Sequence, residues 1–151
     1  MSEKTEKTKG AIKKPEVRGA WATWELVERV LACTAVNRIY IWGPPGVGKT
    51  FAAYHHGRLE RGLYACTLMP ELPAAELRGS YLPQGDTILW HDGPVIRAMR
   101  EGARLVLNEI SHAGEDVLAF LYPILEHDST CRLTLPTGET VTPAPGFHVI
   151  V

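Results

Sequence analysis

The residues best suited to chemistry lie in one stretch, Gly43 to Thr50, with the sequence GPPGVGKT. It matches the phosphate-binding loop pattern G-x-x-x-x-G-K-[ST] at every fixed position. Glycines let the backbone turn so that successive N–H groups point into one concavity, a nest for anionic oxygens. The N-terminus of the helix that follows adds positive potential. The pattern predicts a phosphate site formed by Gly43, Pro44, Pro45, Gly46, Val47, Gly48, Lys49 and Thr50.

The residue types within this loop predict different tasks. Pro44 and Pro45 have no N–H to donate, so the donors are expected to begin at Gly46, while the prolines stiffen the entry to the loop. The Lys49 ammonium is expected to reach the β- and γ-phosphates of a nucleotide and to assist catalysis there, and the Thr50 hydroxyl is expected to bind Mg²⁺. A chance glycine turn before a lysine is the alternative, and the strand and helix expected on either side argue against it.

A second polar group follows a short apolar run. Leu105, Val106 and Leu107 have the composition of a strand buried on both faces of a parallel sheet, and Asn108 and Glu109 come directly after them. Ligands of open α/β sheets bind at the carboxyl ends of the strands, so this pair is expected to face the loop. Glu109 is the candidate base that orients water for attack on the γ-phosphate. A solvated or helix-capping glutamate is the alternative.

Asn108 stands where such sites usually carry an aspartate. Its amide oxygen can accept hydrogen bonds from water on Mg²⁺, but the side chain supplies no negative charge. Loss of such an outer partner commonly costs about 10–100-fold in metal affinity or activity. Nucleotide binding is therefore expected to survive better than turnover.

The elements around these residues alternate between strands and helices. Arg38 to Trp42 is β-branched and aromatic, as expected of the strand that enters the loop, and the helix after the loop is expected to run to about Arg61. Prolines and glycines interrupt residues 69–103 until Pro94 starts a helix that Gly102 ends. Such alternation predicts an α/β fold with a mainly parallel sheet. The other expected elements are helices over 23–35 and 115–126, the second kinked at Pro123, strands over 63–68, 105–107 and 147–151, and a β-hairpin over 131–141.

The composition is that of an ordinary globular protein. The chain has 151 residues, of which 45% are hydrophobic and 22% charged, enough for one domain with a core. A net charge of −1 argues against nucleic acid or an anionic membrane as a partner, and no apolar run approaches the roughly 18 residues of a membrane span. The three cysteines are isolated, and the N-terminus lacks a signal-peptide core, so a cytoplasmic protein with reduced thiols is expected.

The first residues differ from the rest. Basic residues outnumber glutamates there, and sizeable apolar residues are few. This composition predicts a disordered basic tail over residues 1–18 and places the folded domain over residues 19–151. A weak contact with nucleic acid or a protein partner is the alternative to a solvated leader.

Together the motifs resemble those of a known family. The loop from Pro44 to Thr50 is similar to the Walker A motif of AAA+ ATPases, and Leu105 to Ala113 is similar to the Walker B segment of their MoxR-like and dynein-related (midasin-type) branch. The hairpin from Leu133 to Val141 resembles that branch's insertion before sensor 1, and residues 76–102 are similar to its linking segment. The resemblance covers roughly residues 20–151, and the order and spacing of the pieces carry it.

The resemblance implies a fold and an incomplete module. The fold is that of a P-loop NTPase, a three-layer sandwich around a mainly parallel sheet, with a β-hairpin insertion. The family's sensor 1 residue, arginine finger, sensor 2 and helical lid come after the position of Val151, so the chain would be the first half to two-thirds of the module, incomplete at the C-terminus. The strand beside the loop strand would then be missing, leaving an open apolar edge.

The resemblance also implies an activity. ATP with Mg²⁺ would be the ligand, and in the intact module ATP hydrolysis would be coupled to remodelling of a protein partner, within a homo-oligomeric ring. The sequence does not name that partner. Residues 78–94, including Tyr81 and Trp90, are candidates for loops that face it. The basic residue often found in the family near position 112 is usually arginine, and here it is His112.

Two other functions stay open at this point. A nucleotide-binding module without turnover is favoured by Asn108 and by the family elements that the chain lacks. A small P-loop phosphotransferase would need basic residues for an acceptor and a lid, and the segment after Glu109 offers mostly an apolar helix.

Overall fold

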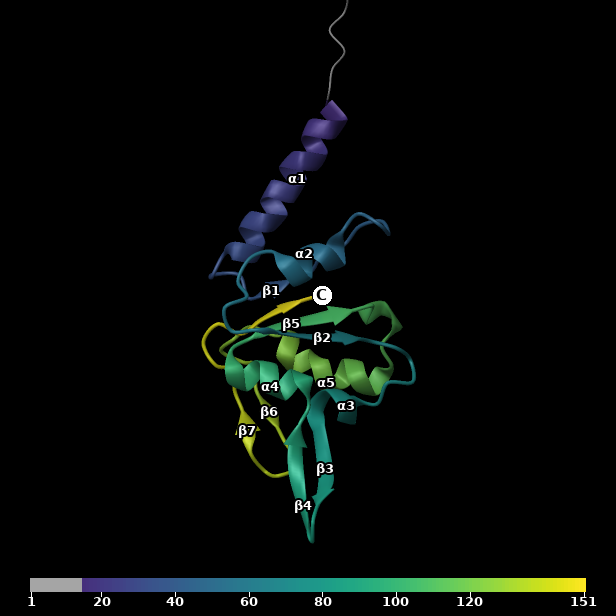
Figure 1. Cartoon of the computed structure of the whole chain (residues 1–151), viewed down its shortest axis with the longest axis vertical. Coiled ribbons are helices and arrows are strands. Elements are labelled where there is room, and N and C mark those ends of the chain that lie inside the picture. The colour runs from purple at the N-terminus through teal and green to yellow at the C-terminus, as the bar shows by residue number, and fades with distance from the viewer. Residues whose placement is uncertain (1–14) are drawn as a thin grey trace, which may run out of the picture.

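A mainly parallel sheet lies at the centre of the protein. The computed structural model describes residues 15–151, with side chains from residue 23 onward. Four strands, all paired in parallel, form the central sheet in the order β1-β8-β5-β2 (Figure 1). The predicted α/β class is confirmed. These strands are β1 (Arg38–Ile39), β2 (Leu63–Thr67), β5 (Arg104–Asn108) and β8 (His148–Ile150).

Helices cover both faces of this sheet. The central strands contribute side chains to two separate cores, because successive strand residues point to opposite faces of the sheet. Val106 and Ile150 pack in the core under α2, while Leu105, Leu107 and Val149 pack in the core on the other face. This arrangement confirms the predicted three-layer sandwich. The helices are α1 (Pro15–Ala32) and α2 (Lys49–His55) on one face, and α3 (Ala74–Arg78), α4 (Pro94–Glu101) and α5 (Glu115–Leu125) on the other (Figure 1).

β1 is an edge strand of the described sheet. It pairs with β8 alone, and a hydrogen bond from the Ile41 N–H to the Val151 carbonyl (2.8 Å) extends the pairing over most of the predicted strand. A cavity of about 250 Å³ borders this strand, and its walls include Ile39, Ile110 and Leu125. The open apolar edge predicted beside the loop strand is therefore present in the part of the chain that the structure describes.

Helix α2 ends at His55, well before the predicted end at Arg61. The chain turns away at Gly57, which has a φ of +77°. A Cβ at this position would lie 2.3 Å from the carbonyl oxygen of Leu31 in α1. Two backbones approach each other here so closely that only glycine fits, and the predicted helix end is wrong for this reason.

Replacing Gly57 with alanine is expected to destabilise the fold strongly. A positive φ costs a non-glycine residue about 1–2 kcal/mol, and the overlap with the Leu31 carbonyl adds to that cost. Gly85→Ala is the matched control, since Gly85 has a φ of +63° but no atom within 4 Å of an added Cβ. Chemical denaturation compares the two variants. A loss of unfolding free energy no larger for Gly57→Ala than for Gly85→Ala would contradict the close contact.

Helix α1 begins at Pro15, earlier than the start predicted at residue 23. Proline suits the first turn of a helix because its missing N–H needs no partner there. The helix overlaps the last residues of the tail predicted over 1–18. The rest of that prediction falls on residues 1–14, which lie outside the described residues, so the division into tail and domain stays a prediction.

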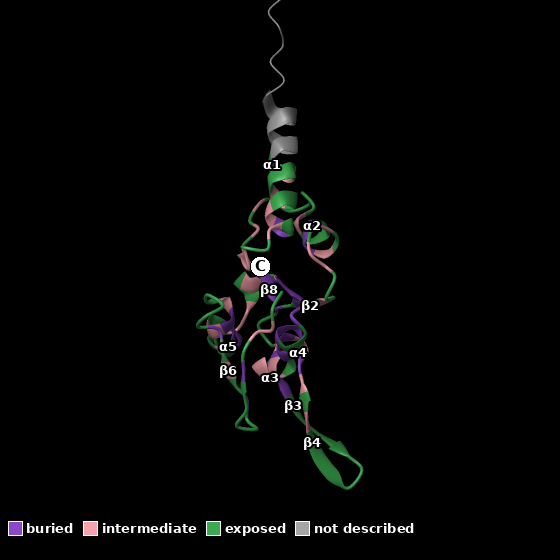
Figure 2. Ribbon diagram, turned by 90° about the vertical axis from the view of Figure 1, so that its left-hand side faces the viewer, coloured by how far each residue is buried: buried purple, intermediate pink, exposed green. Residues whose placement is uncertain are grey.

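An antiparallel hairpin occupies part of the segment for which the sequence predicted no regular structure. β3 (Gly79–Gln84) and β4 (Thr87–Asp92) pair along their whole length and meet at a tight turn that contains Gly85. The hairpin extends away from the body of the protein, and most of its residues are exposed (Figures 1 and 2). Without a buried face it has no alternating apolar pattern, so periodicity could not reveal it.

The other predicted elements are present, but the sequence predicted neither α3 nor the short 3₁₀ helix after β5. α4 ends at Gly102, α5 contains Pro123, and the second hairpin pairs β6 (Leu133–Thr134) with β7 (Thr140–Val141). The 3₁₀ helix η1 (Ile110–His112) follows β5. The free thiols of Cys66 and Cys131 are buried, as expected of core residues, whereas Cys33 is only partly buried. No helix within residues 15–151 is both long and apolar enough to cross a bilayer.

The first residues of strands β5 and β8 form a buried polar pair. Arg104 has 0% and His148 has 2% of its surface exposed. Arg104 Nε donates to His148 Nε2 (2.9 Å), and His148 Nδ1 lies 2.8 Å from the carbonyl oxygen of Gly146. Since Nε2 accepts a hydrogen bond, the proton of the neutral imidazole resides on Nδ1 and is donated to Gly146.

This pair predicts a stability that depends on pH. Burial lowers the pKa of His148 to about 4; the Gly146 carbonyl and Glu60 oppose the shift, and Arg58 and Arg104 add to it. An unfolded histidine, with a pKa of about 6.5, takes up its proton first as the pH falls. The contribution of His148 is therefore full above about pH 6.5 and is lost as the pH falls toward 4, by roughly 2 kcal/mol between about pH 7 and pH 5.

Urea unfolding at these two pH values checks the expectation. His148→Gln removes the titrating group, so the variant should lose most of the difference that wild type shows. Equal pH dependence in both proteins would mean that His148 is not the group that titrates.

Candidate nucleotide-binding site

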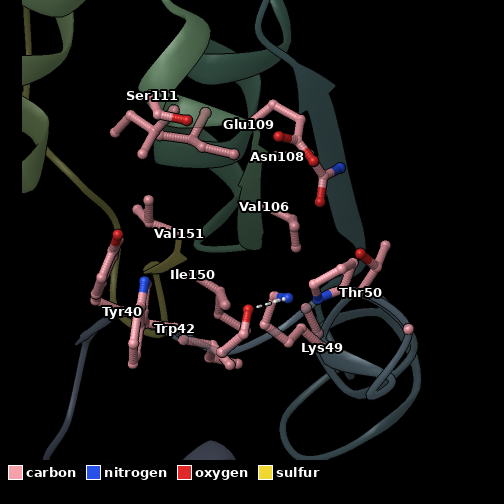
Figure 3. Close-up of a pocket in the computed structure, with 17 residues that line it drawn as sticks. Tyr40, Trp42, Lys49, Thr50, Val106, Asn108, Glu109, Ser111, Ile150 and Val151 are labelled. Carbon is pink, nitrogen blue, oxygen red and sulfur yellow. Dashed lines mark hydrogen bonds between the residues drawn. The ribbon is translucent and has the colours of Figure 1, made fainter.

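The two polar groups predicted from the sequence line one cavity. Its volume is about 470 Å³, and it lies where β1, β5 and β8 end. Asn108 and Glu109 lie on one side of it and Lys49 and Thr50 on the other (Figure 3). The predicted residues that line the cavity are Gly43, Pro45, Gly46, Lys49, Thr50, Asn108 and Glu109. Pro44, Val47 and Gly48 belong to the same loop but are outside this lining.

Two glycines shape the loop. Gly46 has a φ of +78° and Gly48 a φ of +90°, in the left-handed region that glycine adopts at little cost. Gly48 is the N-cap of α2, and neither a side-chain cap nor an acidic residue of the first turn engages the amides there. Amides without such partners suit an anion, and the phosphate nest stays a prediction.

The Lys49 side chain is held over the loop by backbone carbonyls at the start of the loop. Its Nζ donates to the carbonyl oxygens of Gly43 and Pro44, both at 2.8 Å, and the first of these bonds is the dashed line in Figure 3. An ammonium group has three donors, so one remains for another acceptor. The lysine therefore brings a positive charge and an available N–H to the wall of the cavity.

The Asn108 amide is held by a residue that the sequence analysis did not single out. Its Nδ2 donates to the Tyr54 hydroxyl at 2.8 Å. With the nitrogen engaged, Oδ1 stays available as an acceptor. Tyr54 lies four residues after Thr50 on α2, and residues at this spacing share one face of a helix. That spacing is the sequence signal that could have found Tyr54.

Glu109 has a backbone conformation unusual for its type. Its φ is +59°, the one positive value of a non-glycine residue in the described chain. This conformation costs about 1–2 kcal/mol, and such strain gathers at functional sites. The side chain is 62% exposed, with His112 Nδ1 3.9 Å from a carboxylate oxygen. The Glu109 carboxylate is thus open to water at the edge of the cavity.

The donor set of this cavity fits Mg²⁺. Among the described residues, no group of three or more His, Cys, Asp or Glu side chains could hold a metal by itself. Mg²⁺ usually keeps several waters and takes only one or two protein ligands together with substrate phosphates. The Thr50 hydroxyl and Asn108 Oδ1, both from residues that line the cavity, are oxygen donors of the required kind.

Comparison with known proteins identifies the family. A family model described as the AAA domain of the dynein-related subfamily matches residues 38–151. The chain belongs to this family. Protein NorQ of Paracoccus denitrificans is 41% identical to this chain over 116 residues, which are 74% of this chain and 42% of NorQ. The resemblance to dynein-related, MoxR-like AAA+ ATPases is confirmed.

Further comparisons agree with this assignment. The denitrification regulatory protein NirQ of Pseudomonas aeruginosa is 37% identical over 114 residues, 75% of this chain and 44% of NirQ. Protein CbbQ of Hydrogenophilus thermoluteolus is 32% identical over 136 residues, 86% of this chain and 49% of CbbQ. The chain thus spans less than half the length of these relatives.

A solved structure supports the fold. The crystal structure of a candidate ATPase from Cytophaga hutchinsonii superposes with a TM-score of 0.58 at 15% identity, covering 89% of this chain and 41% of that one. At this identity the likeness concerns the fold alone. It agrees with the AAA assignment, because the two chains share the arrangement of sheet and helices.

Proposed function

We propose that this AAA domain binds ATP with Mg²⁺ in the cavity between the loop and β5, and that the intact protein hydrolyses it. The observation that carries the proposal is that the phosphate-loop residues and the pair Asn108–Glu109 line one cavity. Family membership supports ATP as the nucleotide. A small P-loop phosphotransferase, left open by the sequence, has no such support.

The loop residues hold the phosphates in this proposal. The N–H groups from Gly46 to Thr50 and the third donor of Lys49 bind the phosphate oxygens, while Pro44 and Pro45 stiffen the entry to the loop. The Thr50 hydroxyl would hold Mg²⁺ directly, and Asn108 Oδ1 would hold it through water. Bound Mg²⁺ would supply positive charge that offsets the charge of the phosphates.

Glu109 acts on the attacking water. Its carboxylate accepts a hydrogen bond from that water and aims the oxygen at the γ-phosphorus. A bond from the water oxygen to the γ-phosphorus forms as the bond from the γ-phosphorus to the bridging oxygen of ADP breaks. The water proton passes to the carboxylate and from there to the released phosphate. The open position of Glu109 at the cavity edge supports this role.

The Glu109→Gln variant tests this step. A general base contributes about 10²–10⁴-fold, so phosphate release from ATP should fall at least about 100-fold while ATP affinity changes little. Glu126→Gln, an exposed substitution outside the cavity, is the matched control and should release phosphate like wild type. Equal rates for wild type and Glu109→Gln would exclude Glu109 as the base.

Binding of nucleotide without turnover is the second candidate. Asn108 favours it, because an amide supplies no negative charge next to the metal. ATP binding that Lys49→Ala abolishes, with no phosphate release by wild type, would favour this candidate.

We also propose that the intact protein forms a homo-oligomeric ring that remodels a protein partner. The β3–β4 hairpin supports a contact with protein, since Tyr81, Leu82, Ile88 and Leu89 leave 46–70% of their surface exposed. Tyr81 packs edge-on against Trp90 with ring centroids 5.2 Å apart, which stiffens the hairpin. Family membership supports the ring.

A further inference from the structure

A second cavity lies at the amino-terminal ends of the central strands, opposite the nucleotide site. Its volume is about 300 Å³, and Arg104 and His148, the first residues of β5 and β8, belong to its wall. Nucleotide-site residues come instead from the carboxyl ends of the same strands. The two cavities have no lining residue in common, so the second is a separate site.

Positive charge dominates this cavity. Arg58, Arg61 and Arg104 line it, and Glu60 is the one acidic residue among its described lining. Of the ion pairs within 4 Å in the described chain, none involves these four residues. His148 is neutral, because its pKa is lowered to about 4. Three guanidinium groups against one carboxylate leave two positive charges without compensation.

Arg104 is the most deeply placed of these groups. It has 0% of its surface exposed, and its Nε and Nη1 donate to His148 Nε2 and to the carbonyl oxygen of Ala53. Its Nη2 is buried and has no hydrogen-bond partner. A buried cationic donor without a partner is costly, so the lack of an acceptor here points to a ligand.

Arg58 and Arg61 stand nearer to solvent. Arg58 donates to the Asn37 side chain and to the Val36 carbonyl oxygen, but its Nε is buried without a partner. Arg61 is exposed and lies over Gly146, where an added Cβ would be 3.0 Å from its Cδ. The lining of the cavity thus includes an exposed guanidinium and a buried one, and Arg58 and Arg104 each carry a buried donor without a partner.

We propose that this cavity binds a phosphate group, either as inorganic phosphate or as the end of a phosphomonoester. A phosphate dianion matches the two uncompensated charges, whereas a carboxylate matches only one. Guanidinium groups suit phosphate because their planar N–H forks bind two oxygens at once. Arg58 and Arg104, which line the cavity, each have a buried N–H without a protein acceptor, and a bound anion is rich in acceptors.

The experiment is a titration of the full chain with inorganic phosphate, in the Lys49→Ala background, which weakens phosphate binding at the loop. The amide signals of Gly62, Gly102 and Gly146, which line the cavity, are followed by ¹H–¹⁵N NMR. We expect saturable shifts of these signals, and a His148 pKa raised from about 4 by the bound anion. Methyl phosphate, titrated in parallel, shows whether a phosphomonoester also binds.

Two variants make the test specific. Arg61→Ala removes the exposed guanidinium without touching the buried core and should weaken phosphate binding at least about tenfold, the equivalent of one charge-assisted hydrogen bond. Arg132→Ala, an exposed arginine outside the cavity, should leave it unchanged. Absence of saturable shifts, equal binding by Arg61→Ala, or acetate binding as tightly as phosphate would each overturn the proposal.

Discussion

The Lys49→Ala variant is expected to bind ATP at least about 100-fold more weakly than wild type. Lys49 is the only lysine or arginine among the described residues that line the nucleotide cavity. Two of its three donors are engaged by loop carbonyls, which fixes the third toward a phosphate. Charge-assisted bonds to phosphate are about twice as strong as neutral ones, and each 1.4 kcal/mol is about tenfold in affinity. Isothermal calorimetry measures the loss.

The fold itself should survive this substitution. Among the described residues, Lys49 Nζ donates hydrogen bonds only to loop carbonyls, so the free energy of unfolding should change by less than about 1 kcal/mol. Arg97→Ala provides a matched control, since it removes an exposed cation that does not line the cavity. Lys49→Ala binding ATP within a few-fold of wild type, in a stably folded protein, would remove the phosphate role from this residue.

The Asn108→Asp variant is expected to gain Mg²⁺ dependence and turnover, each by about 10–100-fold. The substitution adds the negative charge that the site lacks next to the metal. It also preserves the local contact, because the Tyr54 hydroxyl that accepts from the amide at 2.8 Å can donate to a carboxylate instead. Titrating Mg²⁺ against ATP hydrolysis, in wild type and variant side by side, measures both effects.

Tyr54→Phe sharpens this experiment. In the Asn108→Asp background it removes the donor that orients the new carboxylate, so part of the gain should disappear while the charge stays. If Asn108→Asp leaves both Mg²⁺ dependence and turnover unchanged, this position does not act on the metal.

Two kinds of segment could be predicted from the sequence: a strand that is buried on both faces of the sheet, and a loop whose shape depends only on its own residues. The run from Leu105 to Leu107 is buried on both faces, and such a run leaves a clear apolar signature. The loop from Gly43 to Thr50 is local, since its shape follows from its own glycines. Both therefore lie where the sequence placed them, and the carboxyl ends of parallel strands bring them to one cavity.

The parts of the fold that depend on contacts between distant residues could not be predicted from the sequence. The end of α2 is set by a backbone contact between Gly57 and Leu31, which are far apart in the sequence. The β3–β4 hairpin is exposed on both faces, and only its glycine turn gave a signal. Arg104 begins a strand, where a charge usually marks solvent. It is nevertheless fully buried, and His148 and the Ala53 carbonyl accept hydrogen bonds from its guanidinium.

The central claim is that the phosphate loop and the pair Asn108–Glu109 form one ATP site. Titration of ATP into the 151-residue wild-type chain, with and without Mg²⁺, tests it most directly. We predict that one ATP binds per chain, that the binding is saturable, and that Mg²⁺ raises the affinity for ATP. Absence of binding by a chain that unfolds cooperatively, and is therefore folded, would contradict the claim.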